Sequence, residues 1–136
     1  MQIKSSFIKK LFKPRILSKK IFYLKKMAKL QNSEEFSQFV RDDAARIQIV
    51  VCTTEWSRVC RNLVKNIPDI SDSYSNATFA TVDIDKCSDV RRKHTVASVP
   101  TWLIFKNNEL QAEISTTNQY LVDRKIKKCL TVEPVC

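Results

Sequence analysis

The chain has 136 residues, enough for one hydrophobic core but not for two, so we expect a single domain. Its formal net charge of +10 would suit nucleic acid or an anionic membrane if that charge lay on the folded part. Residues 1–33 hold nine Lys, one Arg and no acid, whereas residues 34–136 hold 14 basic and 14 acidic residues. The body is therefore balanced in charge, and its composition gives no support for nucleic-acid binding.

The cysteines and the single histidine argue against a zinc site, because they do not form paired metal-ligand motifs. The five cysteines are Cys52, Cys60, Cys87, Cys129 and Cys136. No apolar run is long enough to span a bilayer, and no uninterrupted apolar segment follows the basic N-terminal residues as in a secretory signal. We therefore expect a cytoplasmic protein with reduced thiols.

Residues 1–26 form a basic, amphipathic N-terminal arm. Apolar residues lie on one helical face and lysines on the other, until Pro14 interrupts the pattern. Three interpretations remain open: a mitochondrial presequence, a helix that binds a membrane surface or an anionic partner, and an extension or disordered tail outside the working domain. Membrane contact and a mitochondrial location are expected only through this arm. The domain is predicted over residues 27–131, and residues 132–136 form a C-terminal tail.

The first half of the domain alternates strand and helix patterns. Residues 28–31 predict a short edge strand. Asn32 and Ser33 offer a helix cap, and residues 34–44 combine acids in the first turn with apolar residues at helical spacing. Residues 47–52 are a run of mostly β-branched apolar residues, which is typical of a central strand buried on both faces.

The second half continues the alternation. A stripe of apolar residues predicts a helix over 59–70 that contains Pro68. The remaining elements are a strand over 78–84, a short helix over 88–93, a hairpin over 101–105 and 110–114, and a final helix over 118–130 that buries Leu121, Val122 and Ile126. This order predicts an α/β domain with helices on both faces of a sheet. The chain has no Gly, so Asn76, Asn107, Asn108 or Asn118 must fill positions with positive φ.

Three separated motifs resemble the thioredoxin family. The apolar run that leads to Trp56 and Cys60 resembles the strand that ends in the family's Trp-Cys-Gly-Pro-Cys motif. Asp83, Asp85 and Cys87 match an acidic turn of animal-type thioredoxins, and residues 98–101, Ser-Val-Pro-Thr, resemble the family's cis-proline loop. The resemblance covers essentially all of residues 27–130. It implies a thioredoxin fold, with a central mixed sheet of four to five strands and helices on both faces.

The same resemblance implies that the reactive motif is altered. In the family, a thiolate at a helix N-terminus attacks a disulfide, and a second thiol resolves the mixed disulfide. Ser57 falls at the position of the attacking cysteine, and Cys60 falls at that of the resolving cysteine. Val51 falls where the family usually carries a buried Asp that assists proton transfer, and Arg58-Val59 replaces Gly-Pro. A hydroxyl cannot take part in disulfide exchange, so we expect that dithiol turnover is lost.

The resemblance further implies a surface for an extended peptide. Val99, the residue before Pro100, would pair with the backbone of a client, and Trp56 would form an apolar wall beside it. Ordinary semi-buried packing is the alternative role for Trp56.

The thiols leave several roles open. Cys60 is either a small structural residue or a monothiol beside Arg58 that forms a mixed disulfide with glutathione or a client. Cys52 is expected in the core, and its pairing with Cys60 is left open. Cys87 follows an acidic turn, so we expect it to be exposed and to be a candidate for regulatory oxidation or intermolecular pairing. His94 is expected at the surface.

Two functions therefore remain. The first is a mostly monomeric module without dithiol turnover that binds an extended peptide or protein client, including proteins of the thioredoxin system. The second is a weak monothiol oxidoreductase that uses Cys60, with glutathione as the second thiol. Neither needs a metal or a resident cofactor. We favour the first, because both the attacking sulfur and the buried acid are absent.

Overall fold

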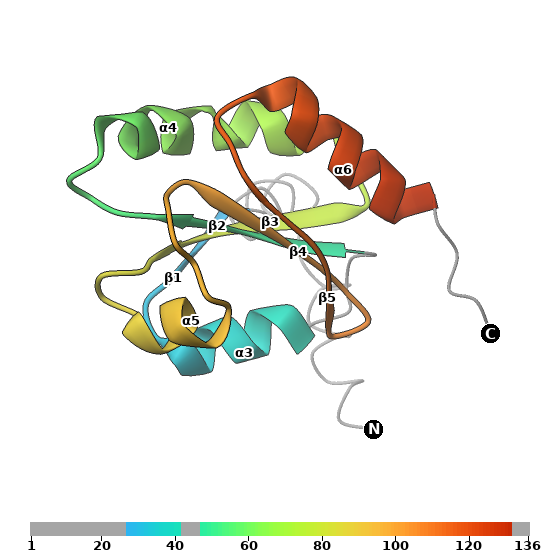
Figure 1. Cartoon of the computed structure of the whole chain (residues 1–136). Helices are drawn as coiled ribbons and strands as arrows, with labels where there is room; N and C mark the ends of the chain where they lie inside the picture. Colours follow the sequence, from blue (N-terminus) through green and yellow to red (C-terminus); the bar gives the residue numbers. More distant parts are fainter. Residues whose placement is uncertain (1–26, 42–46, 132–136) are drawn as a thin grey trace, which may run out of the picture.

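The computed structural model describes residues 27–41 and 47–131 (Figure 1). The predictions for the arm at 1–26 and for the tail at 132–136 lie outside the described residues. No helix within the described ranges is long and apolar enough to cross a bilayer.

Five strands form one mixed sheet, which confirms the predicted architecture. They are β1 (Met27–Leu30), β2 (Ile47–Thr53), β3 (Ala77–Asp83), β4 (Thr101–Lys106) and β5 (Glu109–Ser115). Their order is β1-β3-β2-β4-β5; β1 and β2 run parallel to β3, whereas β4 is antiparallel to β2 and to β5. Every residue of β2 is buried, as expected for the central strand.

The helices cover the sheet in two layers (Figure 1). Helices α3 (Ser33–Arg41) and α5 (Ser88–Lys93) lie on one face, and α4 (Arg58–Asp72) and α6 (Gln119–Thr131) lie on the other. Successive residues of a strand point to opposite faces, so β2 contributes to two cores. Val50 packs in the cluster that contains Phe36 of α3, whereas Val51 packs with Ile67 of α4 and Ile126 of α6.

Leu121 is 40% exposed, so the prediction that the last helix buries it is wrong. Val122 and Ile126 are buried, and they lie four residues apart on the inner face of α6. Leu121 is one residue away from that face, which turns it by roughly 100° toward solvent.

Positive φ angles occur at Asn107 (54°) and Asn108 (64°), which form the tight β4–β5 turn as predicted. The third such residue in the described chain is Thr95 (51°), and neither Asn76 nor Asn118 takes this role. Thr95 follows α5, where its N–H bonds to Arg92 O and the Val96 N–H bonds to Arg91 O. These two hydrogen bonds form the Schellman motif that commonly ends a helix. The residue with positive φ in that motif, here Thr95, is normally Gly.

Candidate functional site

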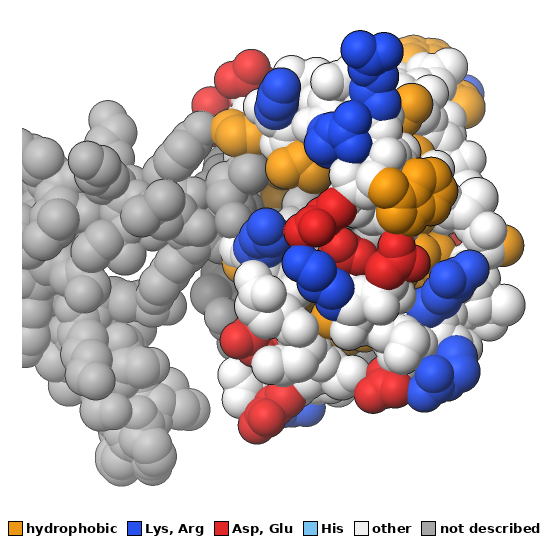
Figure 2. Space-filling view, turned by 90° about the vertical axis from the view of Figure 1, so that its left-hand side faces the viewer, with side chains coloured by type: hydrophobic (Ala, Val, Ile, Leu, Met, Phe, Trp, Pro, Cys, Tyr) orange, Lys and Arg blue, Asp and Glu red, His pale blue; other side chains and the backbone are white. Residues whose placement is uncertain are grey.

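The ends of three strands bring the predicted site residues to one edge of the sheet. Thr53, the last residue of β2, pairs with Asp83 at the end of β3, and Cys52 pairs with Thr101 at the start of β4. The loops that carry Trp56, Asp85 and Pro100 therefore leave the sheet at the same edge. This edge is at the left of Figure 1 and faces the viewer in Figure 2.

Ser57 begins helix α4 as its N-cap. Its backbone is extended (φ −85°, ψ 120°), and its Oγ accepts a hydrogen bond from the Cys60 N–H at 3.3 Å. The Ser57 carbonyl accepts the first helical bond, from the Arg61 N–H at 3.0 Å. The hydroxyl thus satisfies one of the N–H groups that every helix start leaves unpaired. A serine at this position acts as a helix cap and offers no sulfur.

Cys60 and Val51 are both fully buried, with no exposed surface. The Cys60 thiol is free. Val51 lies in the apolar cluster between the sheet and α4, where its neighbours include Ile67 and Trp102. The region beneath the start of α4 therefore has an apolar side chain at the position where the resemblance implied a proton-transferring acid.

Cys52 lies on the other face of the sheet. It is fully buried in the cluster that contains Phe36 and Phe105, and burial raises its pKa to about 12. Cys60 belongs to α4, which covers the opposite face, so the pairing of Cys52 with Cys60 that the sequence left open is not present. Cys52 is a core residue, as predicted.

Trp56 projects from the β2–α4 loop and is 71% exposed. Its Nε1–H donates a hydrogen bond of 2.8 Å to Asp85 Oδ2, and the Asp85 N–H in turn bonds to Asp83 Oδ1 at 2.9 Å. Arg91 Nη1 lies 4.0 Å from the other Asp85 oxygen. The alternative of semi-buried packing for Trp56 is therefore wrong. The indole is held at the surface by one polar contact, and its apolar ring faces solvent.

A second contact joins the same two loops. Lys86 Nζ lies 2.8 Å from Glu55 Oε2, and Arg61 Nη1 donates to the Glu55 carbonyl at 2.7 Å. The hydrogen bond and charge of Lys86 lower the pKa of Glu55. Both groups are exposed, so this pair orients the loop more than it stabilises the fold.

The proline loop completes the edge. The Val99–Pro100 peptide bond is cis, Pro100 is buried, and Val99 is half-buried. Thr101 Oγ1 donates to the Ser98 carbonyl at 2.6 Å. We call the region formed by the exposed Trp56 and Val59 together with Ser57 and the half-buried Val99 the Trp56 surface.

Cys87 is only 4% exposed, so the prediction that it is an exposed thiol is wrong. The N–H groups of Lys86 and Cys87 both bond to the Asp83 carbonyl, which folds the acidic turn back, and Cys87 belongs to the core cluster that contains Phe36. Burial, followed by the charge of Asp83, raises its pKa. Regulatory oxidation or intermolecular pairing requires an accessible thiolate, so the low exposure and the raised pKa both weigh against that role for Cys87.

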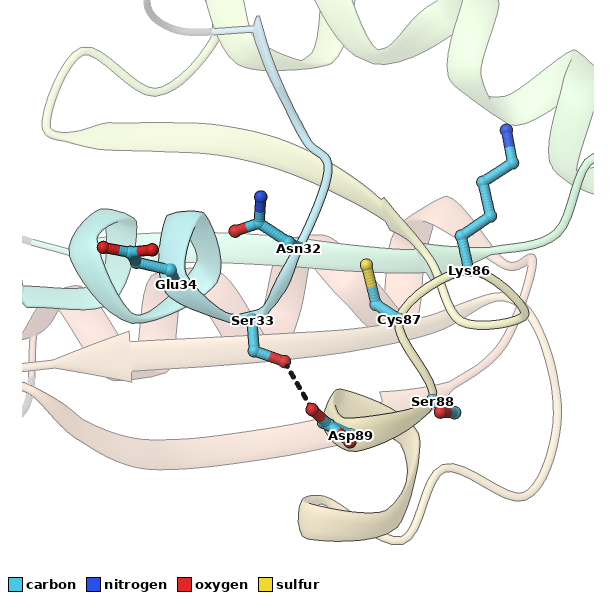
Figure 3. A pocket seen from close by; sticks show the side chains of 7 residues that line it. All are labelled: Asn32, Ser33, Glu34, Lys86, Cys87, Ser88 and Asp89. Atoms are coloured by element: carbon cyan, nitrogen blue, oxygen red, sulfur yellow. Dashed lines mark hydrogen bonds between the residues drawn. The ribbon is translucent and has the colours of Figure 1, made fainter.

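Cys87 also lines a shallow cavity of about 330 Å³ between the starts of α3 and α5 (Figure 3). Asn32, Ser33 and Glu34 line one side, and a hydrogen bond of 3.2 Å from Ser33 Oγ to Asp89 Oδ2 joins the starts of the two helices. Within the described residues, no group of His, Cys, Asp and Glu is arranged to hold a metal ion, at this cavity or elsewhere.

His94 is half-buried, which corrects the expectation of a surface residue. Its ring lies 5.4 Å from the Phe36 ring and 5.6 Å from the Phe105 ring, measured between centroids. Burial lowers its pKa. His94 is thus a packing residue on the α3–α5 side. The sequence contained no signal for this contact, because the three rings come from separate elements.

Comparisons with known proteins agree on one family. The family model described as Thioredoxin matches residues 27–128. Thioredoxin-1 of Schizosaccharomyces pombe is 29% identical over 98 residues, which cover 72% of this chain and 93% of that protein. Thioredoxin AMT13 of Alternaria alternata is 33% identical over 85 residues, covering 62% and 71%. The X-ray structure of Fasciola hepatica thioredoxin superposes with a TM-score of 0.70 at 20% identity, covering 75% and 98%, and supports the fold.

Proposed function

Since the chain belongs to the thioredoxin family of thiol–disulfide exchange proteins, we propose that it binds an extended segment of a partner protein at the Trp56 surface and has lost dithiol turnover. The observation that carries the loss of turnover is the hydrogen bond from the Cys60 N–H to Ser57 Oγ. An oxygen cap stands one helical turn before the remaining thiol, so the two residues cannot form a disulfide. Without a second thiol, a mixed disulfide at this site has no internal means of release.

Two further observations support the loss of turnover. Val51 is fully buried among apolar side chains, so no carboxylate is present there to assist proton transfer. Cys60 has no exposed surface, so its thiol is shielded from a disulfide in solution. The same burial weighs against the alternative, a monothiol oxidoreductase that uses Cys60 with glutathione.

The binding role is supported by what the site retains. Trp56 presents most of its ring to solvent, and Val59 is 49% exposed beside it in sequence. Val99 remains at the neighbouring start of β4. Exposed apolar side chains on a rigid sheet edge, framed by polar contacts, are typical of a surface that binds another chain.

The first experiment measures reduction of insulin by dithiothreitol in the presence of the full chain. We expect background rates for the natural sequence and a clear acceleration for Ser57→Cys, which restores a thiol opposite Cys60. Mass spectrometry of oxidised Ser57→Cys should detect an internal disulfide as the loss of two hydrogens. Cys129→Ser, which removes a half-buried thiol on α6, is the matched control.

The second experiment selects ligands from a displayed library of random peptides. Trp56→Ala should abolish binding of the selected peptides without changing thermal stability, because Trp56 is largely exposed.

In the insulin assay, catalysis by the natural chain that disappears in Cys60→Ser would overturn the loss of turnover. A library that yields no peptide dependent on Trp56 would overturn the binding role.

A further inference from the structure

Helix α4 is charged against its own dipole. The backbone of a helix favours acids near its N-terminus and bases near its C-terminus. In α4 the bases Arg58, Arg61 and Lys65 occupy the N-terminal half, and Asp69 and Asp72 occupy the C-terminal end. There is no acid in the first turn and no base in the last. Helix stability therefore gives no reason for this order of charges.

Helices α3 and α5 show the opposite order, and α6 has no acid in its first turn but has Lys128 in its last. Helix α3 has Glu34 and Glu35 in its first turn and Arg41 in its last. Helix α5 has Asp89 in its first turn and three bases in its last. The reversed order is thus a property of α4, the helix whose start lies at the Trp56 surface.

The positive charges at this start have no carboxylate partner within the described residues. Arg58 and Arg61 are both exposed, and the guanidinium of Arg61 bonds to the Glu55 carbonyl. Two of the nearby acids already have side-chain partners, Glu55 with Lys86, and Asp85 with Trp56 and Arg91. The third, Asp83, accepts the Asp85 N–H. The helix dipole adds to the two guanidinium charges, so the start of α4 has excess positive potential.

Apolar surface lies among these charges. Trp56 and Val59 flank Ser57 and Arg58 along the chain and are both exposed. Figure 2 shows hydrophobic side chains in the middle of this face, acidic side chains beside them, and Lys and Arg side chains around both. An occupant must therefore supply an apolar side chain for the indole and negative charge for the guanidinium groups.

We propose that the Trp56 surface selects an extended, acidic segment of a partner protein, in which an apolar side chain is flanked by Asp or Glu. This inference rests on the proposed binding function and names the chemistry of its partner. The apolar side chain would cover Trp56, and the flanking carboxylates would pair with Arg58 and Arg61. Complementary charges at the edge of such a contact favour the correct partner and speed its association.

The test measures fluorescence polarisation of three labelled peptides with the full chain. The peptides share a central Leu and differ only in the flanking residues, which are Glu, Gln or Lys. We expect the Glu peptide to bind about tenfold more tightly than the Gln peptide, the Lys peptide to bind most weakly, and the differences to shrink in high salt.

Charge reversal separates recognition from folding. Arg58→Glu combined with Arg61→Glu should reverse the order of the peptides. Arg58→Glu alone keeps the bond from Arg61 to the Glu55 carbonyl, so it should weaken binding of the Glu peptide and raise Tm, because an acid then occupies the first turn. A variant that binds less and melts higher cannot have lost binding through unfolding. Lys125→Glu with Lys128→Glu, on exposed positions of α6 away from this edge, is the matched control and should keep the order of the natural chain.

The outcomes distinguish this inference from the function on which it rests. Equal binding of the three peptides, with loss of all binding in Trp56→Ala, would overturn the acidic preference and leave the binding function in place. Failure of all three peptides and of the random library would overturn both. A preference for the Glu peptide that survives the reversal of Arg58 and Arg61 would overturn the assignment to these residues.

Discussion

Helices α3 and α4 start with the same hydrogen-bond pattern and with opposite charges. Asn32 Oδ1 accepts the Glu35 N–H at 2.8 Å, and Ser57 Oγ accepts the Cys60 N–H at 3.3 Å. The first helical bonds are also equivalent, since the Phe36 N–H donates to the Asn32 carbonyl and the Arg61 N–H to the Ser57 carbonyl. The backbone requirement of the two helices is thus met in the same way.

The side chains in the first turns of α3 and α4 differ in their charge and in their contacts. In α3 the acids lie where the helix dipole stabilises them, and Glu35 Oε1 also accepts the Gln31 N–H at 2.7 Å. In α4 the first turn begins with Arg58, and the acids of the neighbouring loops hold Lys86 and the Trp56 indole instead. The start of α3 is therefore stabilised by its charges, whereas the start of α4 carries exposed positive charge that its dipole does not favour.

The largest expected loss of stability comes from placing a carboxylate on either buried face of β2. Val51→Asp on the α4 face and Val50→Asp on the α3 face should each lower the free energy of unfolding by about 3 kcal/mol, because both positions are fully buried in apolar clusters. Urea denaturation monitored by circular dichroism would measure both. If Val51→Asp lowered the free energy of unfolding much less than Val50→Asp does, the α4 face would still accommodate an acid.

The caps should come next. Asn32→Ala and Ser57→Ala should each cost about 1 kcal/mol, with the larger loss at Asn32, whose hydrogen bond is shorter. Asn32→Asp and Ser57→Asp keep an acceptor and should retain most of the stability. Thermal unfolding of the four variants tests this, and a Ser57→Ala variant as stable as the natural chain would contradict the capping role.

The backbone conformation of Thr95, on the α3–α5 side of the sheet, is unfavourable for this residue type. A β-branched residue with positive φ is costly, and Gly relieves that cost, so Thr95→Gly should raise stability by about 1 kcal/mol. Thr95→Ala keeps a Cβ atom and should gain less. Equal stability of Thr95→Gly and the natural chain in urea denaturation would show that the turn carries no such cost.

Exchanging the charges of the first turns should give smaller effects of opposite sign. Arg58→Glu should stabilise α4 and Glu34→Arg should destabilise α3, each by about 0.5 kcal/mol at low salt. Both shifts should diminish as the salt concentration rises, since the side chains are exposed. Differential scanning calorimetry would detect the two signs, and destabilisation by Arg58→Glu would refute the account of α4.

The smallest expected effects are on the pH dependence of stability, and they differ between His94, on the α3–α5 side, and Glu55, in the loop before α4. Burial lowers the pKa of His94 from its ordinary 6.5, so its contribution to stability is present above pH 6.5 and is lost as pH falls through the folded-state pKa. Lys86 lowers the pKa of Glu55 from 4.5, so that contribution is lost only in more acidic solution. In a plot of Tm against pH, His94→Gln should remove the decrease below pH 6.5, and Glu55→Gln should remove the decrease in more acidic solution.

Much of the fold followed from local patterns. The apolar run of β2, the acids after Asn32, and the Asn107–Asn108 turn each carry their own structural signal, and the structure has each element at the predicted place. The sequence was less informative about Leu121 and Cys87, because burial depends on which side of a helix or turn meets the sheet. Thr95 was missed because the chain has no Gly to mark the end of α5.

The candidate site was predictable in its membership and less so in its contacts. The resemblance placed Trp56, Ser57 and Cys60 in order, but the bond from Trp56 to Asp85 spans 29 residues and has no sequence signature. The role of Ser57 as a cap follows from chemistry that is visible in the sequence, since a serine before a helix is a common N-cap. The complete burial of Cys60 required the packing of α4.

The two tryptophans of the chain stand in opposite environments. Trp102 is fully buried, and its Nε1–H donates to the Thr116 carbonyl at 3.2 Å, whereas most of the Trp56 ring meets water. Indole emission moves to shorter wavelength when water is excluded, and a shielded ring escapes collisional quenching by acrylamide. Binding of a partner at Trp56 should therefore change the fluorescence of Trp56 and leave that of Trp102 unchanged, so binding can be followed with the unlabelled protein.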